Sequence, residues 1–205
     1  MEAAVIKSGA FPSIVLTGGP CGGKTTLMRD LRNEDLGSNR WLMVPEAAPL
    51  LFQAGLDGKL KHFQRSVVGL QIALENACAT AAKPGQILLC HRGTLDPLAY
   101  WLRNGWNEDE FFDCTGMTRG QHHQRYFGVI HLQTTAIGAE ESYSNWPYAH
   151  RPESVEQSAE IDRLLHRAWS GHPRYFVVLN DKVDWEAKSH IVREILKGWF
   201  EKAKG

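Results

Sequence analysis

The sequence has no excess of either charge and no long apolar run. Its 23 lysines and arginines equal its 23 aspartates and glutamates, so the formal net charge is zero and the pI is about 7.1. No global positive field therefore favours nucleic acid or an anionic membrane. The longest apolar runs, such as Tyr175–Leu179 and Ile87–Cys90, are far shorter than the roughly 20 residues that cross a bilayer. We expect no nucleic-acid partner and no integral membrane association.

Cysteine is scarce and is not spaced for metal binding or for a disulfide framework. No CxxC pair is present, so the sequence predicts no zinc knuckle. Residues 1–13 contain no apolar stretch long enough for a signal peptide. These features predict a cytoplasmic protein with reduced thiols. The four cysteines are Cys21, Cys78, Cys90 and Cys114.

The 205 residues predict one domain that spans 1–205, in which short β-branched runs alternate with segments of helical period. Parallel strands need long crossovers, and this alternation supplies them. We therefore expect an α/β three-layer sandwich with a parallel sheet of about five strands. The expected strands are Ser13–Thr17, Trp41–Val44, Gln86–Cys90, Phe127–Leu132 and Tyr175–Leu179. The expected helices are Lys24–Leu36, Ala47–Ala54, Gly58–Ala82, Leu95–Leu102, Pro152–Trp169 and Asp184–Lys202.

Two segments do not fit this alternation. Asn104–Gln124 is rich in Gly, Asp and His, and Thr134–Arg151 is rich in Gly, Ser, Asn and Pro. Both follow the ends of expected elements, where ligand-binding loops belong. We expect the first to be a loop and the second to be a lid.

The most specific signal is a glycine-rich motif between the first expected strand and the first expected helix. GGPCGGKT at 18–25 matches G-x-x-x-x-G-K-[ST] in the strand–loop–helix context that this motif requires. Such a loop directs successive backbone N–H groups at phosphate oxygens. Lys24 is then expected to contact the β- and γ-phosphates, and the Thr25 hydroxyl to bind Mg²⁺. The expected nucleotide contacts are Gly19, Pro20, Cys21, Gly22, Gly23, Lys24, Thr25 and Thr26.

Acidic side chains near two other strand ends are candidates for the second half of the site. Glu46 follows the strand Trp41–Val44 and can serve as general base or bind the acceptor hydroxyl, or simply face the dipole of the next helix. Asp96 can contact substrate or cap its helix. His91, rather than an acid, ends its strand. Its role as a magnesium, substrate or packing residue is left open.

Two arginines and a polar loop complete the candidates. Arg92 and Arg151 stand where a guanidinium could stabilise charge on the transferred phosphoryl group, although each could instead form a surface ion pair. Asn180 follows the last strand, in the loop that usually contacts the base. Asp181–Asp184 has only a weak likeness to a guanine-reading element, so ATP and GTP both stay open.

Seven tryptophans are many for this length. Trp101, Trp169 and Trp199 have the helical spacing of core residues. Trp146 lies in the expected lid and is the best candidate to face substrate, and Trp185 also flanks a loop.

Four segments together resemble a known family. TGGPCGGKTT, VPEAA, LLCHRGTLDPLAYW and RPESVEQSAEIDRLLHRAWSGHP follow in that order. The chain from about residue 12 onward is similar to small P-loop ATPase/kinase domains related to ribosylnicotinamide kinase. It is more similar to the nucleotide-binding module of the insect TRPL-translocation-defect protein. That pattern usually has Asp-Arg-Gly where this chain has His91-Arg92-Gly93, a departure that concerns Mg²⁺ coordination.

These observations together predict an ATP- or GTP-dependent kinase that uses Mg²⁺ and a small nucleoside- or vitamin-like acceptor. Lys24, Arg92 and Arg151 would neutralise phosphate charge, and Glu46 would act on the acceptor hydroxyl. Arg92 and Asp96 would also contact substrate. The alternative is a nucleotide-binding regulatory module with weak or no acceptor phosphorylation, because some members of the similar family are nucleotide-binding regulators.

Overall fold

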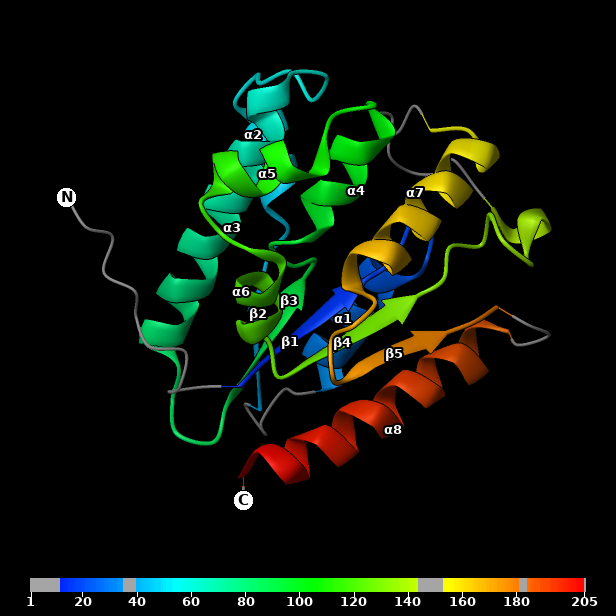
Figure 1. Cartoon of the computed structure of the whole chain (residues 1–205). Coiled ribbons are helices and arrows are strands. Elements are labelled where there is room, and N and C mark those ends of the chain that lie inside the picture. Colours follow the sequence, from blue (N-terminus) through cyan, green and yellow to red (C-terminus); the bar gives the residue numbers. More distant parts are fainter. Residues whose placement is uncertain (1–11, 35–39, 144–152, 181–183, 205) are drawn as a thin grey trace.

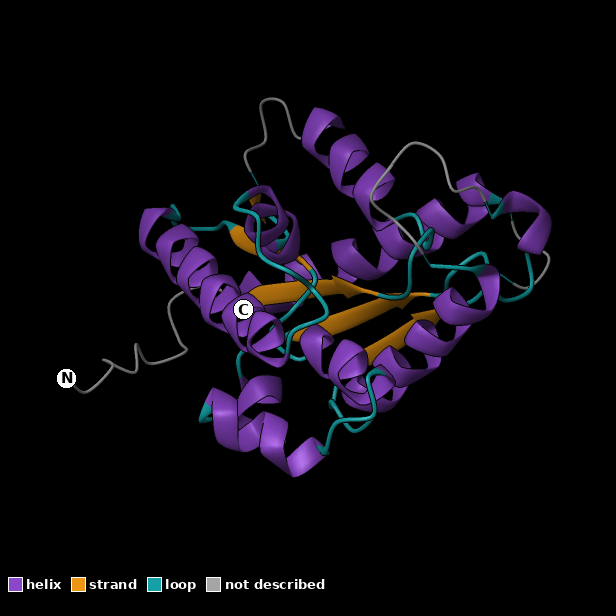
Figure 2. Cartoon of the chain, turned by 90° about the horizontal axis from the view of Figure 1, so that it is seen from above, coloured by secondary structure: helices purple, strands orange, loops and turns teal. Residues whose placement is uncertain are grey.

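A parallel sheet forms the centre of the molecule. The structure is a computed structural model that describes residues 12–34, 40–143, 153–180 and 184–204. Its five strands lie in the order β2-β3-β1-β4-β5, and every neighbouring pair is parallel. Figures 1 and 2 show helices on both faces of this sheet. The expected α/β three-layer class is confirmed.

The strands and long helices agree with the predicted segments to within a few residues. The strands are β1 Ser13–Thr17, β2 Trp41–Val44, β3 Ile87–His91, β4 Gly128–Leu132 and β5 Tyr175–Val178. The helices are α1 Lys24–Glu34, α2 Ala47–Gln53, α3 Lys61–Ala81, α4 Asp96–Arg103, α5 Glu108–Thr115, α6 Arg119–Gln124, α7 Val155–Trp169 and α8 Trp185–Lys204, with a short 3₁₀ turn at Glu140–Ser142.

Successive residues of β1 face opposite sides of the sheet and so belong to two separate cores. Ile14 and Leu16 pack with α1 and α8, whereas Val15 packs with α3, α4, α5 and α7. Burial on both faces explains why the three central strands β1, β3 and β4 read as continuous apolar runs, whereas the edge strands β2 and β5 are only partly buried. Trp101 and Trp169 lie in the second core and Trp199 in the first, which confirms the prediction that these three are core residues.

The prediction of a loop over Asn104–Gln124 is wrong. Asn107 begins α5 by accepting hydrogen bonds from the N–H groups of the second and third residues of the helix, and Thr118 begins α6 with a capping box that includes Gln121. Phe111 and His122 are fully buried, so each short helix has an anchor in the core. The polar composition of the segment reflects its caps and turns.

The carboxyl ends of the strands meet at one edge of the sheet. Because β1 lies directly between β3 and β4, the segments that follow β3 and β4 lie on either side of the glycine-rich loop that follows β1. This edge therefore places two separate segments beside the glycine-rich motif, one on each side. Within the described ranges, no helix is long and apolar enough to span a bilayer.

Candidate nucleotide-binding site

The glycine-rich motif forms a tight loop between β1 and α1. Lys24 is the first residue of α1 and is 5% exposed. Its ammonium donates hydrogen bonds to the carbonyl oxygens of Gly18 and Gly19, both at 2.7 Å. The loop therefore holds a buried cation at the start of a helix, where the helix dipole also favours an anion.

The first glycine of the motif is required by a close approach to β4. Gly18 has a φ of +124°, and a Cβ atom there would lie 2.0 Å from the carbonyl oxygen of Leu132. On the same side, the Thr134 hydroxyl donates to the carbonyl of Pro20. The loop is thus held against the end of β4 in two ways, by the close backbone approach of Gly18 to Leu132 and by the hydrogen bond from the Thr134 side chain.

Charged residues lie on one side of the loop, and we call this group the β3 flank: Glu46, His91, Arg92 and Asp96. Arg92 is its centre. Its Nε donates to Glu46 at 2.7 Å and its Nη1 donates to Asp96 at 3.1 Å. Nη1 also lies 3.4 Å from the carbonyl oxygen of Gly18, and Nη2 donates to the hydroxyl of Tyr100 at 3.1 Å. The guanidinium therefore links two carboxylates to the phosphate loop.

Asp96 is buried and accepts hydrogen bonds from several elements. Its two carboxylate oxygens accept from the Thr17 hydroxyl at 2.8 Å and the Trp169 indole at 3.0 Å. They also accept from the Gly93 N–H at 3.1 Å, which lies before α4, and Leu95 begins α4 without a side-chain cap, so the expectation that Asp96 caps its helix is wrong. With Arg92 these contacts occupy the carboxylate fully. Asp96 therefore ties β1, β3 and α7 together beneath the loop.

His91 lies between Glu46 and Thr25, the residue that follows Lys24. Its Nε2 lies 3.1 Å from the Thr25 hydroxyl, and its Nδ1 lies 3.1 Å from a Glu46 oxygen. Burial alone would raise the pKa of Glu46, but Arg92, and then His91 and Lys24, hold it well below its usual range. Glu46 is therefore an anion within a cluster of cations and hydrogen-bond donors.

Backbone strain is concentrated at the same place. Among the described residues, Cys21 and Arg92 are the two that are not glycine and have a positive φ, at 58° and 68°. Such conformations are disfavoured for residues with a Cβ and persist where the surroundings enforce them. One lies in the phosphate loop and the other in the β3 flank. Both strained residues therefore lie at the edge of the sheet where the strands end.

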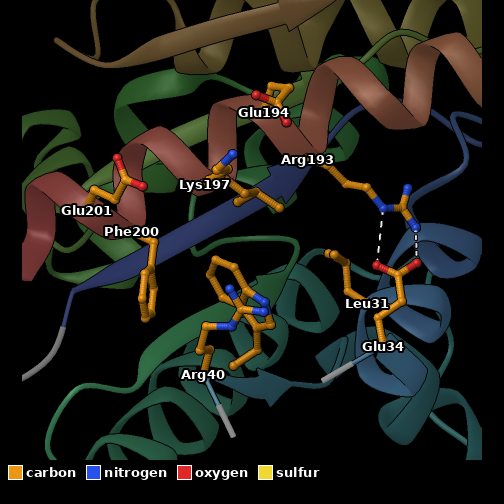
Figure 3. Close-up of a pocket in the computed structure, with 10 residues that line it drawn as sticks. Leu31, Glu34, Arg40, Arg193, Glu194, Lys197, Phe200 and Glu201 are labelled. Carbon is orange, nitrogen blue, oxygen red and sulfur yellow. Dashed lines mark hydrogen bonds and ion pairs between the residues drawn. The ribbon is translucent and has the colours of Figure 1, made fainter. Parts of the chain in front are cut away.

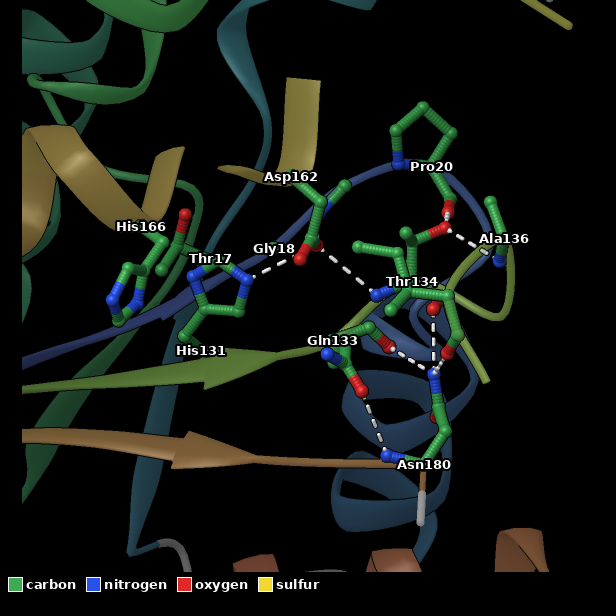
Figure 4. Close-up of polar contacts among 12 residues, drawn as sticks. Thr17, Gly18, Pro20, His131, Gln133, Thr134, Ala136, Asp162, His166 and Asn180 are labelled. Atoms are coloured by element: carbon green, nitrogen blue, oxygen red, sulfur yellow. Dashed lines mark hydrogen bonds and ion pairs between the residues drawn. The ribbon is translucent and has the colours of Figure 1, made fainter. Parts of the chain in front are cut away.

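Residues on the other side of the loop form what we call the β4 flank: His131, Thr134, Asp162, Asn180 and Lys188. Figure 4 shows much of this group. Asp162 of α7 accepts from the N–H groups of Gly19 at 2.7 Å and Thr134 at 3.0 Å, and lies 3.0 Å from His131 Nε2. Burial would raise the pKa of Asp162, but His131 and the two backbone donors lower it. Asp162 therefore anchors the phosphate loop to α7.

Asn180 joins the ends of β4 and β5. Its amide donates to the carbonyl oxygens of Thr134 at 2.5 Å (Figure 4) and Ile137 at 2.9 Å. Its Oδ1 accepts from Lys188 at 2.7 Å. Burial lowers the pKa of Lys188 to about 8, although Asp162 acts in the opposite direction. Asn180, expected to contact the nucleotide, here holds two loops in register.

The structure thus brings most of the predicted residues together. Glu46, Arg92 and Asp96 meet beside the loop, whereas Arg151 and the second part of the proposed lid, from residue 144 onward and including Trp146, lie outside the described residues. Sequence reasoning missed Asp162 and Lys188. A signal for Asp162 was present, because Ser158, Leu165 and Trp169 are spaced to share a helical face with it, and all three are buried.

The comparison with protein families agrees with this geometry. A family model described as an AAA domain matches residues 13–188. The chain belongs to this family. The match begins at β1 and ends at Lys188, so it covers the phosphate loop and both flanks of the AAA domain. None of the curated proteins compared matches the chain.

Magnesium accompanies nucleotides in P-loop proteins, and the residues of this AAA domain fit it only in part. Mg²⁺ prefers oxygen ligands and is usually bound by one or two carboxylates together with phosphates. Near the loop the described side chains offer the Thr25 hydroxyl, backed by the His91 imidazole. No group of three His, Cys, Asp or Glu in the described ranges could hold a metal. The ion would therefore depend on the nucleotide's own oxygens for most of its coordination.

A groove at the opposite end of the AAA domain is not this site. It lies between α1, the start of β2 and α8, and Arg193 forms a double contact with Glu34 in it (Figure 3). Trp41 is the first residue of β2, so the groove lies at the amino ends of the strands. The phosphate loop lies at the carboxyl ends, where parallel sheets bind ligands.

Proposed function

We propose that this AAA domain binds a nucleoside triphosphate and transfers its γ-phosphoryl group to a hydroxyl of a small acceptor. Membership of the family supports nucleotide binding and hydrolysis or phosphotransfer. The kinase activity and a nucleoside- or vitamin-like acceptor, to which the resemblance to ribosylnicotinamide kinase points, are parts of our proposal. We also propose that the nucleotide is ATP or GTP and that it binds together with Mg²⁺.

The observation that carries the proposal is the position of Arg92. Its guanidinium lies between the Gly18 carbonyl of the phosphate loop and the Glu46 carboxylate. Phosphoryl transfer is catalysed mainly by placing positive charge at the transferred group and by positioning the reactants. In our proposal Lys24 and Arg92 stabilise the phosphoryl oxygens from two sides.

Glu46 is then suited to position the acceptor. It lies on the β3 side of the loop and its side chain is 20% exposed. The lowered pKa of Glu46 makes it a weak base but a good hydrogen-bond acceptor. We propose that it accepts the hydrogen bond of the attacking hydroxyl and directs the oxygen at the phosphorus atom.

The test uses γ-labelled ATP and GTP with a panel of nucleosides, vitamins and aminoglycosides. We expect label transfer to at least one acceptor. Glu46→Gln should lower transfer by about 10²-fold and change nucleotide affinity by only a few fold. Glu110→Gln is the matched control, because Glu110 forms an exposed ion pair with Lys61. Tight nucleotide binding without transfer to any acceptor contradicts the kinase proposal.

The contact between His91 and Thr25 favours a second candidate, a nucleotide-binding regulatory module. An imidazole at 3.1 Å from the hydroxyl occupies the place next to the expected metal ligand, and a neutral imidazole is a poor ligand for Mg²⁺. In this case His91→Asp should strengthen magnesium dependence and raise nucleotide turnover. An unchanged magnesium dependence and rate would place His91 outside the metal shell.

A further inference from the structure

An aromatic ring lies directly on the phosphate loop. Gly23 has a φ of +92°, and a Cβ atom there would lie 2.1 Å from Cζ3 and 2.7 Å from Cη2 of Trp185. Any side chain at this position would displace the indole, so glycine is required by the contact as well as by the backbone conformation. The ring therefore lies next to the residue that precedes Lys24.

The exposure of Trp185 differs from that of the core tryptophans. Trp185 is 36% exposed, whereas Trp101, Trp169 and Trp199 are at most 7% exposed. A large apolar ring that is left partly open to solvent beside a ligand loop offers a flat surface for stacking. Trp185 begins α8, at the edge of the sheet where the strands end.

The groove beside the ring has the charge expected for a base and not for a phosphate. It lies between α1 and α8, and its charged lining is three carboxylates, those of Asp30, Asp184 and Glu186, against one guanidinium, that of Arg193, with the imidazole of His190 beside them. Carboxylates repel phosphate but accept hydrogen bonds from amino groups and ring N–H groups. The ammonium of Lys24, the residue after Gly23, instead contacts the carbonyl oxygens of Gly18 and Gly19. Charge thus changes sign along the path from the phosphate loop to this groove.

We propose that Trp185 stacks on the base of the bound nucleotide and that the site selects purine triphosphates. The inference rests on the proposed function, because the phosphate loop must hold the phosphates for the base to reach the indole. A purine presents a larger ring to the indole than a pyrimidine, so purine nucleotides gain more from the stack. The Asn180 amide is already bonded to the segments that follow β4 and to Lys188, whereas the Trp185 ring is partly open to solvent.

The test compares ligands with and without a base. Calorimetry would measure the affinities of ATP, CTP and inorganic tripolyphosphate for the full chain and for Trp185→Leu and Trp185→Phe. Trp185→Leu should weaken ATP binding by roughly 10- to 100-fold, weaken CTP binding less, and leave tripolyphosphate binding within about threefold. Trp185→Phe, which keeps a ring, should retain most of the ATP affinity. Trp106→Leu, which alters a half-buried tryptophan packed on Trp101, is the matched control.

Two results would overturn the inference. Equal losses for ATP and tripolyphosphate would show that Trp185 supports the loop without contacting the base, and unchanged ATP affinity in Trp185→Leu would show no contact at all. A loss of folding in Trp185→Leu would appear in its thermal melt, and Trp185→Phe then decides by the same comparison of ligands. If the wild-type chain bound neither ATP nor tripolyphosphate, the proposed function would fail first.

Discussion

The two flanks of the phosphate loop are built from different chemistry. In the β3 flank, two carboxylates and an imidazole surround a guanidinium, and the contacts are mostly between side chains. In the β4 flank, most contacts are to backbone groups, such as those from Asp162 to Gly19 and Thr134. Charge that develops during phosphoryl transfer needs charged partners, whereas a loop of fixed shape needs its N–H groups satisfied. We therefore propose that the β3 flank takes part in the chemistry and that the β4 flank fixes the shape of the loop.

Lys24 belongs to neither flank, and its removal should have the largest effect. Lys24→Ala deletes the buried ammonium expected to contact the β- and γ-phosphates, so nucleotide affinity and turnover should fall by at least about 10²–10³-fold. Calorimetry and a product assay check this. Lys61→Ala, which removes an exposed lysine paired with Glu110, should leave both unchanged. Wild-type affinity and turnover in Lys24→Ala would refute the phosphate-loop assignment.

Arg92→Lys tests the chemical role of the β3 flank. A lysine keeps the charge but cannot contact Glu46, Asp96 and Tyr100 at once as the guanidinium does. Phosphoryl transfer should fall by about 10²-fold, with a loss of about 2 kcal/mol in the free energy of unfolding. The control is Arg103→Lys, which alters a pair with Glu160 on the surface. A variant with normal transfer would remove the distinction between the flanks.

Asp162→Asn tests the geometric role of the β4 flank. The amide keeps the size of the side chain but loses the negative charge that accepts from Gly19 and Thr134. Nucleotide affinity should fall by about tenfold, while the rate of transfer from bound nucleotide stays close to wild type. Titration and single-turnover kinetics separate these two quantities, and Glu160→Gln on the same helix is the control. A fall in rate with unchanged affinity would assign Asp162 to the chemistry.

The pH dependence of stability should show the cost of burying Lys188. Burial lowers the pKa of Lys188 from 10.5 to about 8. Above pH 8 the unfolded chain therefore binds more protons at this lysine than the folded chain does, so its contribution to the free energy of unfolding rises with pH. Relative to Lys188→Met, the wild type should gain about 1–2 kcal/mol between pH 8 and about pH 9.5. Denaturant unfolding measures this, with Lys197→Met as control, and equal pH profiles would contradict it.

The sequence predicted the sheet and the β3 flank better than the β4 flank. Buried parallel strands have a strong apolar signature, and Glu46, Arg92 and Asp96 each follow or lie close to a strand end. Asp162 lies within α7, 143 residues from Gly19, and no local pattern links the two. The helices α5 and α6 were missed because their caps and polar faces resemble a loop until Phe111 and His122 are seen buried.

The capped helix α7 connects its own first turn to the phosphate loop. It begins at the capping box of Ser154 and Gln157, and eight residues after Ser154 it presents Asp162 to Gly19. At 1.5 Å per residue this spans about 12 Å along the helix axis. A rotation of α7 at its first turn would therefore move the Asp162 carboxylate relative to the Gly19 N–H from which it accepts a hydrogen bond. The position of the phosphate loop and the orientation of α7 are therefore coupled through a single carboxylate, that of Asp162.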